Sequence, residues 1–310
     1  MFGQYLISFR EVLEAALITS IILVYLKRTG REELLRYVWL GVIIAVLASI
    51  IMGLFVWIAY GEFSGESMKL FEGVTALIAV AVLTSMVIWM ATKGKYLKEE
   101  LQSKLGTAVK KGSMLGLIGL AFIIVFREGF ETVLFLTPFI VNDMVGTMTG
   151  AALGIVSSSI IAYAIFGLGI RIKLGRLFYF SSILLIFLAA GLAGYGTHEL
   201  IEYQEVTGAE VGWFGSNAFD LGIQESSILH HKGAIGSVLA VMFGYSASME
   251  WGRLIVHVLY IAVFIPLTII SYKKPEIFGH LIKLGKKIRQ AISFPQKGTT
   301  QKNTKNNTVF

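Results

Sequence analysis

Residues 9–17 read FREVLEAAL, and residues 126–134 read FREGFETVL. Both stretches place an arginine and two glutamates, at the same spacing, inside a long apolar segment. A charged side chain near the centre of a bilayer costs roughly 2.5–3.5 kcal/mol to insert, so six of them would cost about 15–20 kcal/mol without compensation. That penalty exceeds the folding stability of a typical protein, about 5–15 kcal/mol. We therefore expect the six groups to face one another, water or an ion.

The composition of the rest of the chain indicates an integral membrane protein. Of 310 residues, 55% are hydrophobic and only 15% are charged, and the mean hydropathy is +0.72. Soluble domains carry about 25% charged residues. The chain has no cysteine, which excludes disulfides, thiolate metal sites and cysteine nucleophiles. Any metal must be held by oxygen or imidazole, which favours hard or borderline ions.

Seven apolar segments are long enough, at about 20 residues or more, to cross a bilayer as helices. They cover residues 4–26, 37–60, 68–92, 113–140, 145–170, 177–197 and 251–272. If these segments alternate in direction, 22 of the 27 lysines and arginines fall on one side of the membrane. The positive-inside rule makes that side cytoplasmic, with the N-terminus outside and the C-terminus inside. The predicted fold class is an all-α integral membrane protein with seven transmembrane helices.

The net charge of +7 is explained by this topology, so we exclude nucleic acid as a partner. The outer side has the opposite character, because an expected acidic loop at 198–250 carries seven acids and a single lysine, Lys232. Such a surface would attract cations, although an ordinary solvated loop has the same composition. On the other side, residues 273–310 form a basic cytoplasmic tail that we expect to be disordered after about residue 290.

The two charged motifs also indicate an internal repeat. They lie 117 residues apart, in the first and fourth apolar segments. Since three segments separate the two starts, the motifs run through the membrane in opposite directions. This is the pattern of an inverted 3+3 repeat, in which the binding site lies near the midplane between the repeats. Repeat one would cover about 4–92 and repeat two about 113–197, with the seventh span at 251–272 outside both.

The spacing within each motif predicts how its charges interact. On a helix, the arginine and the second glutamate are four residues apart and the two glutamates three apart, so all share one face. If the two helices cross, four carboxylates and two guanidiniums meet with a formal sum of −2, which a multivalent cation or protons would balance. Carboxylate oxygens suit a hard cation, and each arginine would orient a carboxylate. The alternative is a pair of intrahelical ion pairs joining two helices, which would leave Glu11 and Glu128 unpaired.

Two R-E-x-x-E motifs in the first and fourth of seven spans resemble the high-affinity iron permeases, the oxidase-dependent iron transporter family. FEGVTALIAVAVLTSMVIWM at 71–90, HELIE at 198–202 and GYSASMEWGRLIVHVLYI at 244–261 add to the resemblance. It covers about residues 1–272, which would form one permease domain. The resemblance implies a protein that is not an enzyme, binds iron at the motif glutamates during import across the cytoplasmic (plasma) membrane, and needs no organic cofactor. The implied metal ligands are Glu11, Glu14, Glu128 and Glu131, oriented by Arg10 and Arg127.

The resemblance also raises an external iron-oxidising or iron-delivering protein as a partner, besides iron ions and the lipid bilayer, and an oligomer is compatible with it. The acidic D-A-S-E element of the fungal members has no clear counterpart in the last external loop. A transporter of another hard or borderline divalent cation, such as manganese or lead, or a proton-coupled carrier would share every feature of the sequence. A zinc protease is unsupported, because HELIE lacks the second histidine of H-E-x-x-H.

Four further side chains are secondary candidates, as ligands that take up the ion from outside or relay it inward. Each has a simpler explanation, since a glutamate near a helix end can extend to the interface and the others can belong to a solvated surface. These candidates are Glu72, His198, Glu199 and Glu202.

Overall fold

The computed structural model describes residues 1–93, 103, 105–106, 114–167, 174–224, 227–229, 235–236, 239–240 and 244–273. Long helices dominate these residues: α1 (Phe2–Arg28), α2 (Leu35–Gly61), α3 (Glu66–Lys93), α5 (Met114–Asn142), α6 (Met144–Phe166), α7 (Leu174–Val206) and α9 (Trp251–Lys273). Two 3-10 turns (Glu32–Leu34 and Gly212–Phe214) and two short strands, β1 (Asn217–Asp220) and β2 (Ser248–Glu250), complete them. The tail expected to be disordered lies outside the described residues.

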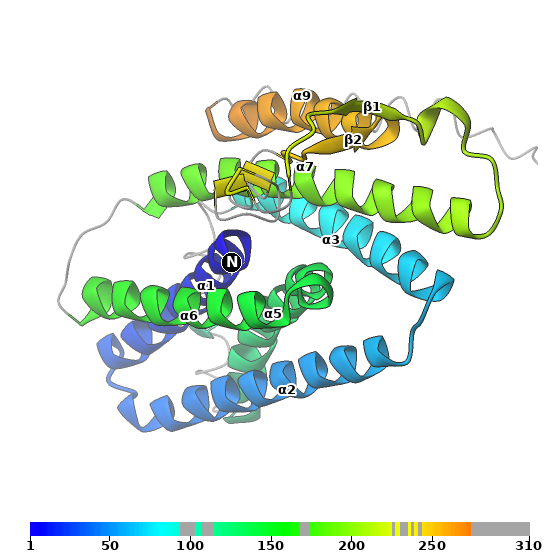
Figure 1. Ribbon diagram of the computed structural model, residues 1–310. Coiled ribbons are helices and arrows are strands. Elements are labelled where there is room, and N and C mark those ends of the chain that lie inside the picture. The colour runs from blue at the N-terminus through cyan, green and yellow to red at the C-terminus, as the bar shows by residue number, and fades with distance from the viewer. Residues whose placement is uncertain are drawn as a thin grey trace, which may run out of the picture.

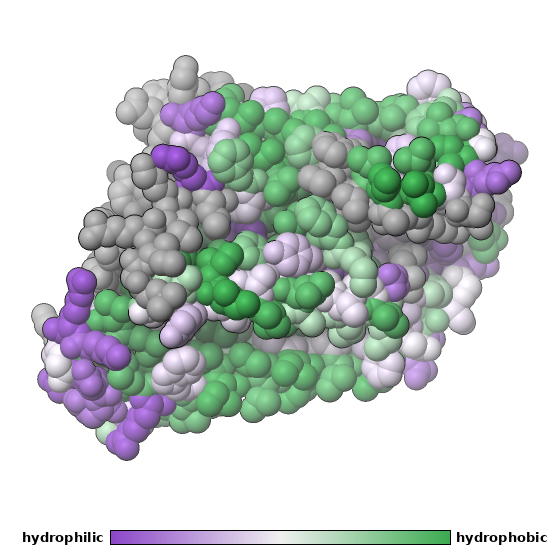
Figure 2. All heavy atoms as spheres, turned by 60° about the vertical axis from the view of Figure 1, so that its left-hand side comes forward, coloured by the Kyte–Doolittle hydropathy of each residue, from purple (hydrophilic) through white to green (hydrophobic). Residues whose placement is uncertain are grey.

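The outer surface of the helices is apolar. Five of them, α2, α3, α6, α7 and α9, are long and apolar enough to cross a membrane. On α2, large side chains such as Ile51, Leu54 and Phe55 point outward, which in water would expose an extended apolar patch. Figure 2 shows hydrophobic side chains as a broad band with hydrophilic ones gathered at its ends. The molecule is therefore a multi-pass, all-α membrane protein.

Local sequence signals end and begin the helices. After α1, Gly30 adopts a φ of 67°, where its N–H donates to Lys27 O and the next N–H, of Arg31, donates to Leu26 O. These two bonds form a Schellman motif, which a glycine in the left-handed region favours. Between α5 and α6, the Asp143 carboxylate accepts a hydrogen bond of 2.8 Å from Gly146 N and caps α6. A single residue therefore separates the end of α5 from the start of α6.

The helices pack in two groups that meet at the centre (Figure 1). In one group α1 packs against α5 and α6, and α2 packs against α5; in the other, α7 lies between α3 and α9. Glycines bring the helices of the first group close together. A Cβ on Gly154 of α6 would lie 2.7 Å from Tyr5 O of α1, and one on Gly41 of α2 would lie 2.5 Å from Ile118 O of α5. Small residues of this kind allow close helix packing in lipid.

The segment expected as an outer loop at 198–250 differs from that expectation. The helix α7 continues to Val206, because Glu, Leu, Ile and Gln in HELIEYQEV are adequate helix formers. Further along, β1 and β2 pair antiparallel, with Asn217 opposite Glu250. His198, Glu199 and Glu202 consequently lie on a helix rather than in a loop, and the small sheet is a feature that the sequence analysis did not predict.

Candidate metal centre between α1 and α5

The two charged motifs meet where α1 crosses α5. Arg10, Glu11 and Glu14 of α1 are buried, as are Glu128 and Glu131 of α5. In each helix the motif lies well inside the element, away from both ends. The predicted convergence of the two motifs is therefore present in the structure.

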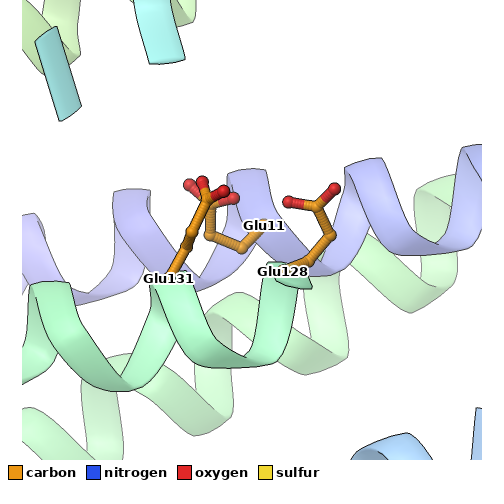
Figure 3. A group of neighbouring side chains, drawn as sticks. All are labelled: Glu11, Glu128 and Glu131. Atoms are coloured by element: carbon orange, nitrogen blue, oxygen red, sulfur yellow. The ribbon is translucent and has the colours of Figure 1, made fainter. Parts of the chain in front are cut away.

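Three carboxylates form the centre of this cluster (Figure 3). Glu11, Glu128 and Glu131 each offer an oxygen atom, and these atoms all lie within 4.8 Å of one another. Glu11 Oε2, Glu128 Oε2 and Glu131 Oε2 are buried, accept no hydrogen bond from the described part of the chain and belong to none of its ion pairs. Because a buried carboxylate without a partner is strongly unfavourable, these oxygens require a proton or a cation. Oxygen ligands of this type suit a hard or borderline metal ion.

Glu14 lies outside this group of three. Its Oε1 is 2.7 Å from Arg10 Nη2, while Arg10 Nη1 donates to Glu11 Oε1, also at 2.7 Å. The Arg10 guanidinium thus bridges the carboxylates of Glu14 and Glu11. The structure brings three of the four expected ligands together, with Glu14 next to them. Each of the four glutamates is ion-paired with the arginine of its own motif, so the pairing expected to leave Glu11 and Glu128 unpaired does not do so.

The two motif arginines differ in their surroundings, although their motifs are alike. Arg10 is only 2% exposed, whereas the Arg127 side chain is 40% exposed. Arg127 lies 3.1 Å from Glu128 Oε1 and 3.3 Å from Glu131 Oε1, and its guanidinium stacks over the Trp89 ring at 5.0 Å. Arg10 is therefore enclosed by its partners, and Arg127 is held partly by an aromatic face.

Two residues of α3 complete the surroundings of the centre, and the sequence analysis missed both. Met86 is buried, and its Sδ accepts a hydrogen bond of 2.9 Å from Arg10 Nη1; Trp89 carries Arg127. Neither residue differs in type from its apolar neighbours in the span, so polarity gives no signal for them. Only their spacing of three residues, which places both on one face of α3, would have linked them.

Comparison with known proteins identifies the family of the chain that carries this centre. Residues 1–271 match the model of the Iron permease FTR1 family. The chain belongs to this family. It is 35% identical over 279 residues to the ferrous iron permease EfeU of Yersinia pestis, covering 89% of this chain and 95% of the relative. It is 33% identical over 270 residues to EfeU of an Escherichia coli strain, covering 84% of this chain and 92% of the relative.

A further relative, an uncharacterized protein of Archaeoglobus fulgidus, is 46% identical over 272 residues, covering 88% of this chain and 96% of that protein. No solved structure matches the chain. Membership of the iron permease family makes the protein a transporter and not an enzyme, with iron as the transported substrate.

The secondary candidates of this iron permease gather at a second cluster, between the start of α3 and the end of α7. Lys69 Nζ lies 2.9 Å from Glu199 Oε2 and 2.6 Å from Glu202 Oε2. His198 Nε2 lies 3.3 Å from Glu202 Oε1. The lysine at the centre of this cluster was not among the sequence-based candidates. Its position three residues before Glu72, on the same helix face, was the signal that could have found it.

Hydrogen bonds hold the other members of this second cluster. Glu72 is buried and accepts from the Tyr195 hydroxyl at 2.6 Å and from the Tyr60 hydroxyl at 3.2 Å. His198 Nδ1 lies 3.1 Å from Glu250 Oε1 of β2. The hydrogen bond from His198 lowers the pKa of the Glu250 carboxyl below its ordinary value. The small sheet thus positions an additional acid, absent from the sequence-based candidates, beside the cluster.

The second cluster is separate from the first. Glu72 and Met86 are fourteen residues apart on α3, which corresponds to about 21 Å of helix. Buried apolar side chains of the central core, including Ala79, Val80 and Leu83, lie between them on the same helix. Along α3, an apolar section therefore separates the second cluster from the carboxylates of the motifs.

Proposed function

We propose that this iron permease imports iron, in the ferrous form named for its relatives, across the cytoplasmic membrane. In this proposal Glu11, Glu128 and Glu131 hold the ion directly, and Glu14 completes the charge balance through its pair with Arg10. The observation that carries the proposal is the set of buried carboxylate oxygens that accept no hydrogen bond from the described residues. The comparison with other iron permeases supports iron as the ion that fills this set.

The packing of the helices supports an inverted repeat with seven membrane-crossing helices. Exchanging the triplet α1–α2–α3 with α5–α6–α7 turns the contact of α1 with α6 into the contact of α5 with α2, and both contacts are extensive. The remaining central contacts, α1 with α5 and α3 with α7, map onto themselves. Under this symmetry the motifs lie near the bilayer midplane, with the N-terminus outside and the C-terminus inside.

The charges of the centre favour one divalent ion at a time. Four ionised carboxylates and two guanidiniums sum to −2, and burial of an unbalanced charge is strongly unfavourable. One ferrous ion would bring the sum to zero. Manganese or lead would satisfy the same arithmetic, so competition between these metals and iron during uptake decides which ion the centre prefers.

Import requires a rearrangement, because apolar side chains separate the two clusters. We propose that the second cluster, which includes Glu72, His198, Glu199 and Glu202, lies on the outer side of the membrane and attracts the ion first. We call it the outer cluster from here on. Rocking of one repeat against the other would then open the path past α3 to the centre. Protonation of the coupled carboxylates would release the ion inward.

The test is uptake of ferrous iron into liposomes that contain the purified protein, kept under reducing conditions. Glu11→Gln and Glu128→Gln keep the shape of each side chain and remove a ligand charge, so both should abolish uptake. Glu14→Gln should retain partial uptake, because this residue contacts the ion only through Arg10. Glu66→Gln, at an exposed position on α3, is the matched control. Normal uptake by both Glu11→Gln and Glu128→Gln would show that the centre is not the transport site.

A further inference from the structure

The outer cluster contains a buried carboxylate whose counter-charge comes from a flexible side chain. The Glu199 side chain is 5% exposed, and within the described residues Lys69 is the only side chain that is ion-paired or hydrogen-bonded to it. A carboxylate so deeply buried needs a positive charge or a proton close by. The charge of Arg253 interacts with that of Glu199, but among the described residues it is the Lys69 ammonium that touches the carboxylate. Lys69 therefore occupies the place of an ion.

The geometry of this place is that of a shared cation site. Lys69 Nζ touches one oxygen of Glu199 and one of Glu202, at 2.9 and 2.6 Å. The two glutamates are three residues apart, so they project from one face of α7, and the ammonium comes from α3 on the other side. A metal ion placed between the same two oxygens would meet two carboxylate ligands.

The lysine can leave this place more easily than the carboxylates can. Its side chain is 34% exposed, and an ammonium on a four-carbon stem has many alternative rotamers. Lys69 is the fourth residue of α3, at the end of the helix, where extended side chains reach solvent. Glu199, in contrast, is fixed in the packed interface between α3 and α7.

We propose that the Lys69 ammonium is a tethered cation that occupies the Glu199–Glu202 pair between transport cycles, and that an incoming iron ion displaces it. This inference rests on the proposed function. Counted with Lys69 alone, the pair of carboxylates keeps one excess negative charge, whereas a divalent ion neutralises both. His198, 3.3 Å from Glu202 Oε1, adds the same charge in either state and does not change this difference. A monovalent ion offers no more charge than the ammonium that it would replace. Lys69 thus admits divalent ions and rejects monovalent ones before either reaches the motif centre.

Displacement can be measured directly by the chemical accessibility of the lysine. The full-length protein in detergent is treated briefly with a water-soluble acetylating ester, and acetylation of each lysine is quantified by peptide mass spectrometry. Adding ferrous iron should raise the labelling rate of Lys69 about fivefold, the factor expected when an exposed ion pair is lost. Sodium at matched ionic strength should not change it. Lys27, exposed at the end of α1, is the internal control and should keep its rate.

Variants test the same exchange through transport. Lys69→Met removes the tethered cation, so sodium should inhibit iron uptake at a concentration about tenfold lower, because the bare carboxylate pair now attracts monovalent ions as well as divalent ones. Lys69→Arg keeps the charge and should behave as the unaltered protein. Glu199→Gln should make Lys69 react rapidly with or without iron.

The inference is overturned if ferrous iron leaves the labelling of Lys69 unchanged, and this measurement needs no variant to fold. It is also overturned if sodium inhibits the unaltered protein and Lys69→Met equally. Failure of the proposed function looks different: liposomes with unaltered protein would take up no iron, while Lys69 labelling in detergent would still respond to the metal. Normal uptake with an unresponsive Lys69 refutes the tethered cation alone.

Discussion

Replacing each motif arginine by glutamine tests whether the two R-E-x-x-E motifs contribute equally to the free energy of unfolding. The sequence makes Arg10 and Arg127 equivalent, since each is followed by glutamates at the same spacing. The structure does not: Arg10 is 2% exposed and contacts two carboxylates and the Met86 sulfur, while Arg127 is 40% exposed and rests on Trp89. We expect Arg10→Gln to destabilise the protein much more than Arg127→Gln.

The magnitudes follow from the burial of each pair. Removing one partner of a buried ion pair costs about 3–5 kcal/mol, because the other charge is left uncompensated. Arg10→Gln leaves both Glu11 and Glu14 in that state, so its cost lies at the upper end of this range. Glu128 and Glu131 are buried, but Arg127 is 40% exposed, so water screens these pairs and each contributes at most about 1 kcal/mol. Stacking of a guanidinium on an aromatic ring adds about 0.5–1 kcal/mol. Arg127→Gln should therefore cost about 1–2 kcal/mol.

The free energy of unfolding can be measured by titrating detergent-solubilised protein with a denaturant and following tryptophan fluorescence. The double variant Arg10→Gln/Glu14→Gln restores the charge balance of the pair and should recover part of the stability lost in Arg10→Gln. A double-variant cycle with Glu14→Gln alone gives the coupling energy between the two side chains. The matched cycle pairs Arg127→Gln with Glu131→Gln.

Equal destabilisation by Arg10→Gln and Arg127→Gln would refute this reasoning, since it would mean that burial does not distinguish the two arginines. A coupling energy near zero between Arg10 and Glu14 would also contradict it, because the 2.7 Å contact would then contribute nothing. If Arg10→Gln fails to accumulate in the membrane while the double variant does, the expected rescue is observed as expression.

Two further predictions concern packing and acid sensitivity. Gly154→Ala should destabilise the protein by about 1–3 kcal/mol, since the added Cβ would meet the α1 backbone at 2.7 Å. Gly119→Ala should be neutral or slightly stabilising, because a Cβ there meets nothing within 4 Å. Thermal unfolding of the two variants compares their stabilities. The lowered pKa of Glu250 means that its contact with His198 stabilises the protein above about pH 4.3, the ordinary glutamate value, and is lost as the pH falls through the lowered pKa. Glu250→Gln should remove this acid-dependent loss, as measured by unfolding temperatures between about pH 3 and 7; an unchanged acid profile would contradict the assignment.

Much of the architecture could be predicted because the bilayer makes composition informative. Long apolar segments have few alternatives to helices in lipid, since every backbone polar group must be satisfied internally. The helix starting at Trp251 and the helix pair α5–α6, interrupted at Asp143, follow from hydropathy and a cap. The extension of α7 to Val206 and the strand pair β1–β2 could not be predicted in this way, because outside the apolar spans hydropathy no longer distinguishes helix, strand and loop.

The candidate site also has features that the sequence could predict and contacts that it could not. The spacing within each motif was enough to place its glutamates on one face of their helix, because helical periodicity is a local property; that the two faces meet is a tertiary contact. The contact of Arg10 with Met86 and that of Lys69 with Glu199 join helices far apart in the chain. No spacing rule reports such contacts, since they depend on how α3 lies against α1 and α7.

The sequence by itself determined that six charges lie inside a membrane protein and that two motifs carry them in the same order. Their insertion penalty required them to face one another, water or an ion, whatever the details of the packing. Only the tertiary structure decided the role of each group. Glu14 is bound to a buried arginine, and three carboxylates each keep an oxygen open to an ion. The two arginines have unequal surroundings. The physical reason is that the order and helical spacing of the charged residues are local properties of the chain, whereas burial depends on which helices cover each side chain.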